Sequence, residues 1–486
     1  MIDLCRASIF TPPHKRELTQ LLVELAAMGI LLVASIGTFG CVDVALGLGV
    51  AYIVPRLIFA WVSRGDFKGG VVMTAVGLLL VAWGFHNIYS WTVAGGHLLC
   101  DPILHSDDSV YYQWALHYLD GSVPEPTTKF EGFPMIVLIS WRLFGHNIVW
   151  PTAINVMLTL FSVAITGLTA GRMLAGKLNV DKRLITFLAM LITSLLGFFL
   201  SHATQLLKEP TSYFSVALAA YAIARMKETD AQAHLGKNLW RDIALFTIAV
   251  VLMAASRTSV IYFMIAGVVL AWLDNAKMWR YAATLLVIAA IGVGVGIYWS
   301  NGFSWEVQKR ILTGADGAAD IMQKLYQAHG IYGVIMSDYF SMTVLEKICF
   351  LPVTCALQFF IPLPWPTGAE TGFWANVTRF QGMWYAVVCF YIYYLAAFSW
   401  KKGNLGAWAL WPLVCAAAIA FATSGTVSRY LLPFEPLFVI VALWTALRLH
   451  ADWRHGIRHR SFLIWAVTYT AVLTAALAYC FFFTAD

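Results

Sequence analysis

Two adjacent carboxylates stand out in a chain that is otherwise strongly apolar. Asp107 and Asp108 belong to the segment HSDDSVYY (residues 105–112), the first strongly polar cluster after three long apolar runs. Neighbouring carboxylates can raise one another's pKa, accept a proton from a hydroxyl as a general base, or hold a divalent cation. We therefore take Asp107 and Asp108 as candidate catalytic residues. If the protein uses a metal ion, Mg²⁺ or Mn²⁺, one of these two is its expected ligand.

Cationic side chains farther along the chain suit a phosphate or pyrophosphate. Lys208, Arg257 and Arg429 each lie at the end of an apolar run. Arginine binds phosphate with two parallel hydrogen bonds, and lysine acts as a point charge. Arg257 and Arg429 are equally consistent with cations that reach lipid headgroups. Glu209 precedes Pro210 at a predicted helix start, where backbone N–H groups can bind an anion and where a carboxylate is also an ordinary stabilising residue.

Aromatic and histidine side chains complete the predicted site. Asp108, Tyr111 and Tyr112 have the spacing i, i+3, i+4, so one face of a short helix would present all three. Tyrosine rings suit the faces of sugars, although an aromatic belt at a membrane surface predicts the same residues. His202 lies shortly before the lysine–glutamate pair and is either a packed histidine or a substrate contact.

The elements that must position these residues are membrane-spanning helices. Hydrophobic residues make up 60% of the 486 residues and charged residues only 12%. Apolar runs of roughly 20 residues recur, each long enough to cross a bilayer, and they predict an all-α polytopic bundle of about 13 transmembrane helices. A transmembrane β-barrel would instead show short alternating segments. The predicted spans are residues 18–38, 42–62, 71–93, 148–169, 184–200, 211–224, 243–255, 260–273, 282–299, 383–399, 407–422, 431–447 and 462–483.

The spans organise the chain as one integral membrane domain. Its predicted parts are N-terminal helices that precede the acidic motif (1–95), a first extracytoplasmic loop with that motif (96–145), a helical core (146–300), a second extracytoplasmic loop (301–382) and C-terminal helices (383–486). Phe133–Phe144 is too short to span and is predicted as an interfacial helix, with Trp141 and Arg142 at the level of the headgroups. The apolar stretch near residues 346–364 is either re-entrant or a true span.

Charge distribution predicts the sidedness. Basic residues gather in alternate loops, which places those loops and the N-terminus in the cytoplasm. The acidic cluster and the three site cations then meet at the extracytoplasmic face. The net charge of +6 is explained by these loops and does not indicate nucleic-acid binding.

The order of these motifs resembles that of the GT-C glycosyltransferases, polytopic enzymes that use polyprenyl-phosphate-linked sugars. The acidic motif lies in the first large extracytoplasmic loop and is followed by the helix from Gly132 to Phe144. The later motifs KEP (208–210), SR (256–257), PLPW (362–365) and SRYLLP (428–433) are similar to those of bacterial GT-C-like proteins of cell-surface polysaccharide pathways. The resemblance covers about residues 96–447. The chain departs from the family's usual pattern in that three spans rather than one precede the acidic loop.

The resemblance implies a function and a role for each site residue. It implies transfer of a sugar, with inversion, from a polyprenyl-phosphate donor to a lipid or glycan acceptor within the membrane lipids. Asp107 or Asp108 would be the general base, and Glu209 and His202 would be supporting partners or sugar contacts. The lipid phosphate, which is also the leaving group, would be held by three cations: Lys208, Arg257 and Arg429.

Two other functions stay open. A polysaccharide polymerase or ligase that uses a polyprenyl-pyrophosphate-linked glycan needs the cations more than a carboxylate. A lipid-linked oligosaccharide flippase or transporter predicts inverted repeats or charges at mid-span. The sequence shows no repeat, and the central portions of its spans are almost free of charged residues.

Overall fold

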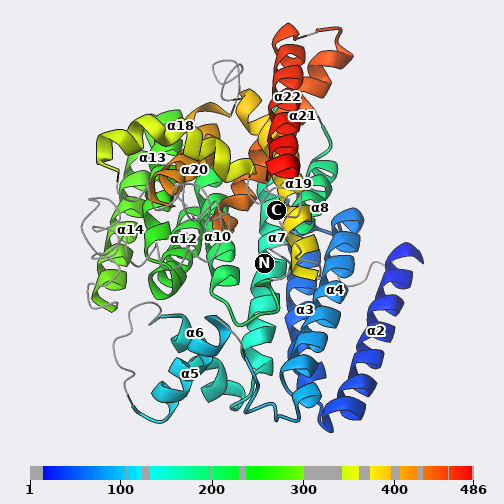
Figure 1. Ribbon diagram of the computed structural model, residues 1–486. Coiled ribbons are helices and arrows are strands. Elements are labelled where there is room, and N and C mark those ends of the chain that lie inside the picture. Colours follow the sequence, from blue (N-terminus) through cyan, green and yellow to red (C-terminus); the bar gives the residue numbers. More distant parts are fainter. Residues whose placement is uncertain are drawn as a thin grey trace.

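The computed structural model describes residues 15–104, 107–122, 132–178, 180–196, 200, 202–228, 237–299, 342–360, 373–395, 405–423, 431–457 and 459–483. These residues form helices joined by short turns, with no strand among them (Figure 1). Seven of the described helical segments are long and apolar enough to cross a membrane: 19–39, 43–63, 67–95, 149–178, 239–256, 276–298 and 432–454. The predicted all-α polytopic membrane fold is confirmed.

The first three helices form a group on one side of the molecule (Figure 1). They are α2 (Lys15–Phe39), α3 (Asp43–Ser63) and α4 (Phe67–Trp91). Their bounds agree with the predicted spans to within a few residues. The turn between α3 and α4 is sharp because Arg64 adopts a left-handed conformation with φ 53°, and the side chain of Asp66 then caps α4 by accepting a hydrogen bond from the Gly69 N–H.

The acidic segment forms the first of two short helices at one end of the bundle. These helices are α5 (Asp107–Leu119) and α6 (Phe133–Phe144), and they lie together at the lower end in Figure 1. Both were predicted from the sequence, α6 with the same bounds. Two edge-to-face ring pairs join them, Tyr111 with Phe133 and Tyr112 with Trp141, each with centroids 5.0 Å apart.

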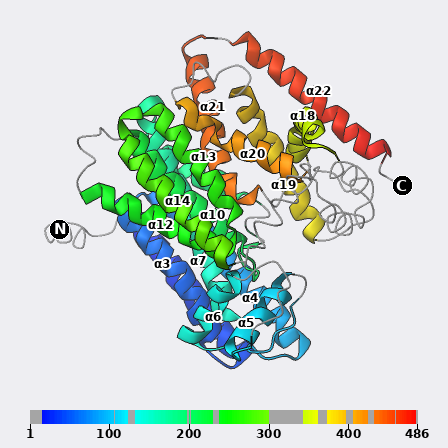
Figure 2. The same ribbon diagram turned by 90° about the vertical axis from the view of Figure 1, so that its left-hand side faces the viewer.

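The long helix α7 (Val149–Leu178) is the centre of the molecule. It contacts α3, α4, α6, α8 (Lys182–Ser194) and α10 (Glu209–Glu228). The next three helices are α12 (Lys237–Ser256), α13 (Ser259–Asp274) and α14 (Trp279–Trp299). The first two pack on α10, and α14 packs on α12 and α13. Figure 2 shows them as one group beside α3 and α7. Because α10 contacts both α7 and α12, it lies where the two groups of helices meet.

The C-terminal helices pack against this core. They are α18 (Val344–Phe360), α19 (Phe373–Tyr394), α20 (Trp411–Thr423), α21 (Glu435–Arg454) and α22 (Arg460–Phe483). The 3₁₀ turn η8 (Leu432–Phe434) leads into α21 and packs on α10. A ring contact between Phe434 and Phe263, with centroids 4.9 Å apart, also joins this turn to α13.

Some predicted bounds were wrong. The helix expected from residue 383 begins at Phe373, inside the stretch assigned to the second extracytoplasmic loop. Its polar residues suggested a loop, but Gln381 is fully buried and donates a hydrogen bond to Glu435 at 2.8 Å. The span expected to reach residue 200 forms a helix only as far as Ser194.

Two further corrections concern polar and aromatic side chains. Glu24 and Arg56 form an ion pair at 3.0 Å between α2 and α3, so the spans carry more internal charge than the sequence suggested. Trp141 does not face the headgroups, because it is buried and its indole N–H donates to the Asn147 carbonyl at 2.9 Å. Arg142 on the same turn of α6 is exposed, as expected.

Gly132 joins the short helices to the bundle. A Cβ at this position would overlap the backbone carbonyl of Ala255, near the end of α12. The backbones of the two segments therefore touch without a side chain between them. This contact holds the α5–α6 unit against the turn that carries Arg257.

We expect Gly132→Ala to destabilise the protein by about 1–3 kcal/mol, because the added methyl group must push α6 away from α12. The thermal unfolding midpoint of the purified protein in detergent measures this change. Gly176→Ala in α7 is the matched control, since no atom lies within 4 Å of its Cβ position. Equal midpoints for the two variants would contradict the proposed contact.

Candidate active site

Asp108 lies in the first turn of α5 and points into the protein. Its side chain is only 8% exposed, and its carboxylate accepts a hydrogen bond from the backbone N–H of Leu206. Asp107, one residue earlier, is partly exposed. The structure thus separates two residues that the sequence could not, with Asp108 inside and Asp107 nearer the surface.

The surroundings of Asp108 favour its protonated form. Its pKa is raised from 3.8 to about 7, mainly by burial and then by the negative charges of Asp107 and Glu209. The hydrogen bond from Leu206 opposes this change only in part. A carboxyl group with a pKa near neutrality can both accept and release a proton under physiological conditions, as general acid–base catalysis requires.

A buried ion pair lies next to Asp108. Glu209, the first residue of α10, is 2% exposed. Its Oε1 lies 3.2 Å from Nη2 of Arg257, which follows the last residue of α12. Lys208, immediately before α10, is also buried, with 7% of its surface exposed. Glu209 therefore lies near both Asp108, whose pKa its charge helps to raise, and Arg257, although the three residues are far apart in the sequence. Lys208 is the residue before Glu209.

The segment that leads into α10 is held by amide side chains from two spans. Asn155 of α7 donates through Nδ2 to the carbonyls of Gln205, at 2.7 Å, and Leu207, at 2.9 Å. Asn87 of α4 donates to the Thr204 hydroxyl at 2.8 Å. These contacts fix the backbone that offers the Leu206 N–H to Asp108.

Neither asparagine was predicted as a site residue from the sequence. Asn155 is almost completely buried, and burial of an amide in an apolar bundle is costly unless its hydrogen bonds are satisfied. An isolated polar residue within a predicted span was therefore the signal that could have identified Asn155 as a positioning residue.

Tyr111 and Tyr112 lie in the core between α5 and α6. They are 1% and 3% exposed, and the rings of Phe133 and Trp141 pack against them. The Tyr112 hydroxyl donates to the Cys100 carbonyl at 2.6 Å. These contacts anchor α5 and leave little of either ring for a substrate, in contrast to the role expected from the sequence.

Of the remaining predicted site residues, the structure describes His202 but not Arg429. His202 is buried in the segment before α10, where its carbonyl accepts a hydrogen bond from the Gln205 N–H at 3.3 Å. Arg429 lies outside the described residues, as does His105. The described chain resumes at Leu431, and the following turn η8 packs on α10.

Glu435, at the start of α21, was not predicted as a site residue from the sequence. It is fully buried and accepts hydrogen bonds from Gln381 and Tyr385.

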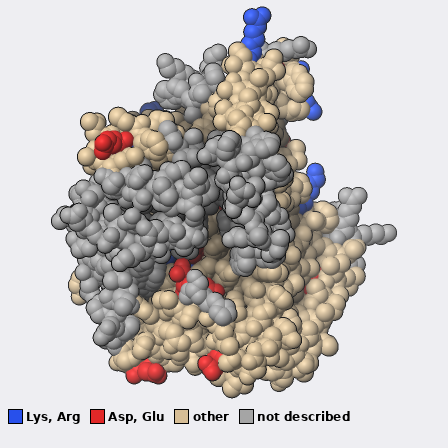
Figure 3. Space-filling model, in the orientation of Figure 1, with Lys and Arg blue, Asp and Glu red and all other residues tan. Residues whose placement is uncertain are grey.

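The charged groups are distributed unevenly over the molecule. Figure 3 shows acidic side chains at the end where α5 and α6 lie and in a recess just above them, while most of the visible basic side chains lie toward the other end. Among the described residues, no group of three or more His, Cys, Asp or Glu side chains could by itself hold a metal ion.

Comparisons with known proteins found a weak structural similarity. No protein-family model and no curated protein matches the chain. Among solved structures, the archaeal oligosaccharyltransferase AglB from Archaeoglobus fulgidus, in complex with an inhibitory peptide and a dolichol-phosphate, aligns with a TM-score of 0.43 and 13% sequence identity. The alignment covers 82% of this chain and 54% of that one, so the chain spans about half the length of AglB. At this level of similarity, functional inference rests on the residues of the chain itself.

We expect Asp108→Asn to raise the thermal unfolding midpoint at pH 8 but not at pH 4. A folded-state pKa of about 7, instead of 3.8, means that ionisation at pH 8 costs the folded protein about 4 kcal/mol. This cost grows as the pH rises from about 4 to 7, and an amide avoids it while still accepting the Leu206 hydrogen bond.

Asp107→Asn is the matched control for this experiment, because it removes the same charge from a partly exposed position one residue away. It should change the midpoint much less. A pH-independent effect of Asp108→Asn, or equal effects of the two variants, would show that Asp108 is not buried as described.

Proposed function

We propose that the protein is a membrane glycosyltransferase of the GT-C type that transfers a sugar from a polyprenyl-phosphate donor to a hydroxyl group of a lipid or glycan acceptor. The observation that supports this function most directly is the position of Asp108, a buried carboxyl group with a pKa near 7 beside the Glu209–Arg257 ion pair. The motif order in the sequence supports the same class of enzyme. The proposed location is the extracytoplasmic face of a bacterial inner membrane.

The proposed reaction is a single displacement with inversion. The acceptor oxygen attacks the anomeric carbon of the donor sugar while the bond from that carbon to the phosphate oxygen breaks. The bond's electron pair leaves with the polyprenyl phosphate, and the hydroxyl proton moves to the carboxylate of Asp108. Only the ionised form of Asp108 can accept this proton, so its pKa of about 7 places the onset of activity near neutrality.

Lys208 and Arg257 are the proposed ligands of the donor phosphate. Both are largely buried, where their charges act on a phosphate more strongly than they would in water. Glu209 contacts Arg257 at 3.2 Å and would act as a positioning residue that fixes the guanidinium. Arg429 is proposed as a third phosphate ligand on the basis of its motif alone, and His202 as a supporting residue.

A divalent cation is compatible with this arrangement but has no complete ligand set in the described residues. Asp108, with or without Asp107, would contribute carboxylate oxygens, and donor phosphate oxygens would have to complete the set, which is a common arrangement for Mg²⁺. Bound Mg²⁺ or Mn²⁺ would neutralise charge on the leaving phosphate.

The test is turnover of radiolabelled polyprenyl-phosphate and polyprenyl-pyrophosphate sugars by the purified protein in nanodiscs. We expect the wild type to consume a monophosphate donor and Asp108→Asn to reduce the rate by about 10²–10⁴, the usual contribution of a general base. The wild-type rate should rise with pH through about 7, because the base form is then populated.

Asp107→Asn distinguishes the two carboxylates in this assay. It should retain most of the activity and move the rise in rate to lower pH, because the charge of Asp107 contributes to the raised pKa of Asp108. If pyrophosphate donors alone are consumed, and Asp108→Asn consumes them equally well, the protein is a polymerase or ligase. Lipid binding without any turnover would instead favour a flippase or transporter.

A further inference from the structure

A cavity lies at the opposite end of the bundle from Asp108. It has a volume of about 570 Å³ and is lined by residues of α3, α7, α8, α10 and α12 and of the turn after α3. Arg241, which lines it, and Arg257, which belongs to the candidate active site, lie near the two ends of α12, about 24 Å apart along the helix. The two sites are therefore separate and lie toward opposite surfaces of the proposed membrane domain.

The wall between α7 and α8 is built by close helix packing. A Cβ at Gly171 would overlap the Thr186 hydroxyl, and a Cβ at Gly167 would overlap the side chain of Met190. These small residues, one turn apart on α7, let α8 approach closely. The approach places Arg172, the residue after Gly171, near Lys182 at the start of α8.

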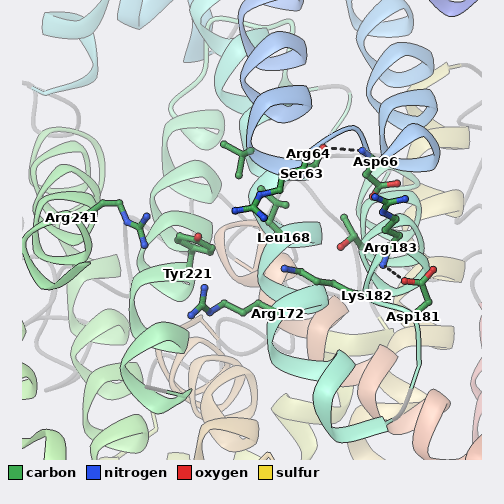
Figure 4. A pocket seen from close by; sticks show the side chains of 12 residues that line it. Ser63, Arg64, Asp66, Leu168, Arg172, Asp181, Lys182, Arg183, Tyr221 and Arg241 are labelled. Carbon is green, nitrogen blue, oxygen red and sulfur yellow. Dashed lines mark hydrogen bonds between the residues drawn. The ribbon is translucent and has the colours of Figure 1, made fainter. Parts of the chain in front are cut away.

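Positive charge dominates the cavity. Its lining contains two carboxylates, Asp66 and Asp181, and five cations: Arg64, Arg172, Lys182, Arg183 and Arg241. Figure 4 shows Arg64, Arg172 and Lys182 extending toward a common space beside Tyr221, with Arg241 on the far side of that ring. Arg183 lies on the other side of the cavity, together with the two carboxylates. The space around Tyr221 is thus lined by four cations that come from four different elements.

The two carboxylates of the lining already serve as helix caps. Asp66 accepts a hydrogen bond from the Gly69 N–H at 3.2 Å, and Asp181 accepts one from the Arg183 N–H at 3.0 Å. A third carboxylate, Asp242, lies 3.6 Å from Arg241 but is shared with the buried Arg225, at 2.7 Å. The two capping carboxylates keep their negative charge, but five cations outnumber them in the lining, so the cavity has a net positive charge.

Arg64 adopts an unfavourable backbone conformation. Arg64 is the one non-glycine residue among the described residues with a positive φ, at 53°. A left-handed conformation costs a residue other than glycine about 1–2 kcal/mol. This conformation ends α3 and directs the Arg64 side chain to the cavity.

We propose that this cavity binds a phosphate group, either the headgroup of an anionic membrane lipid or a soluble phosphate compound. Arginine and lysine are the residues that recognise phosphate oxygens. Basic pockets between transmembrane helices are typical sites for anionic headgroups. The volume is large enough for a headgroup or a small phosphorylated molecule. This inference does not depend on the proposed glycosyl transfer.

The test compares the intact protein with the double variant Arg172→Gln/Lys182→Gln, using native mass spectrometry after addition of phosphatidylglycerol, cardiolipin or phosphatidylcholine. Inorganic pyrophosphate is added in a parallel thermal-shift titration to detect a soluble ligand. We expect the wild type to bind at least one of the anionic probes in preference to phosphatidylcholine, and the double variant to bind that probe at least tenfold more weakly.

The matched control is Lys277→Gln/Arg280→Gln, which removes two charges at the α13–α14 connection, outside the cavity lining. It should bind like the wild type. The more conservative variant Arg172→Lys keeps the charge and guards against a folding defect, and it should bind with intermediate affinity. Preference for a lipid or for pyrophosphate identifies the source of the phosphate. No binding of any anionic probe, or equal losses in both double variants, would overturn the proposal.

Discussion

The ion pair between Glu209 and Arg257 is the interaction on which the candidate site depends. It joins the start of α10 to the end of α12 inside an apolar bundle, at 3.2 Å. A buried carboxylate without a cation is strongly destabilising, so the two helix ends must stay together. The negative charge of Glu209 in turn contributes to the raised pKa of Asp108. A single pair therefore stabilises the helix junction and helps to set the protonation of its neighbour.

The residues around the Glu209–Arg257 ion pair support it by holding the backbone in place rather than by adding charge. Asn155 holds the two carbonyls on either side of Leu206, and the N–H of Leu206 is what Asp108 contacts. On the other side, Gly132 brings α6 onto the backbone near Arg257. The candidate base and the proposed phosphate ligands are thus carried by segments that contact one another directly, which favours preorganisation of these groups. The basic cavity at the other end of α10 and α12 gives the bundle two chemically distinct ends.

Much of this fold follows from the sequence, because apolar runs, loop charges and helix breakers act locally. The bounds of α6 and the helix carrying Asp108, Tyr111 and Tyr112 were predicted in this way. Burial depth was not predictable, because it depends on packing between distant segments. Asp108 and Asp107 look alike in the sequence, and the rings of Tyr111 and Tyr112 look available until α6 covers them. The early start of α19 was missed for the same reason, since the partner of Gln381 is Glu435, far away in the chain.

We expect Asp108 to stay protonated in the folded protein until the pH approaches neutrality, and infrared difference spectroscopy measures this directly. The spectrum of the wild type minus that of Asp108→Asn, recorded across a pH titration in nanodiscs, isolates the carbonyl stretch of one protonated carboxyl group. This band should disappear with a midpoint near pH 7, and at lower pH in the Asp107→Asn background. If it disappears near pH 4, as for an exposed carboxylate, Asp108 does not have the raised pKa on which the proposed catalysis depends.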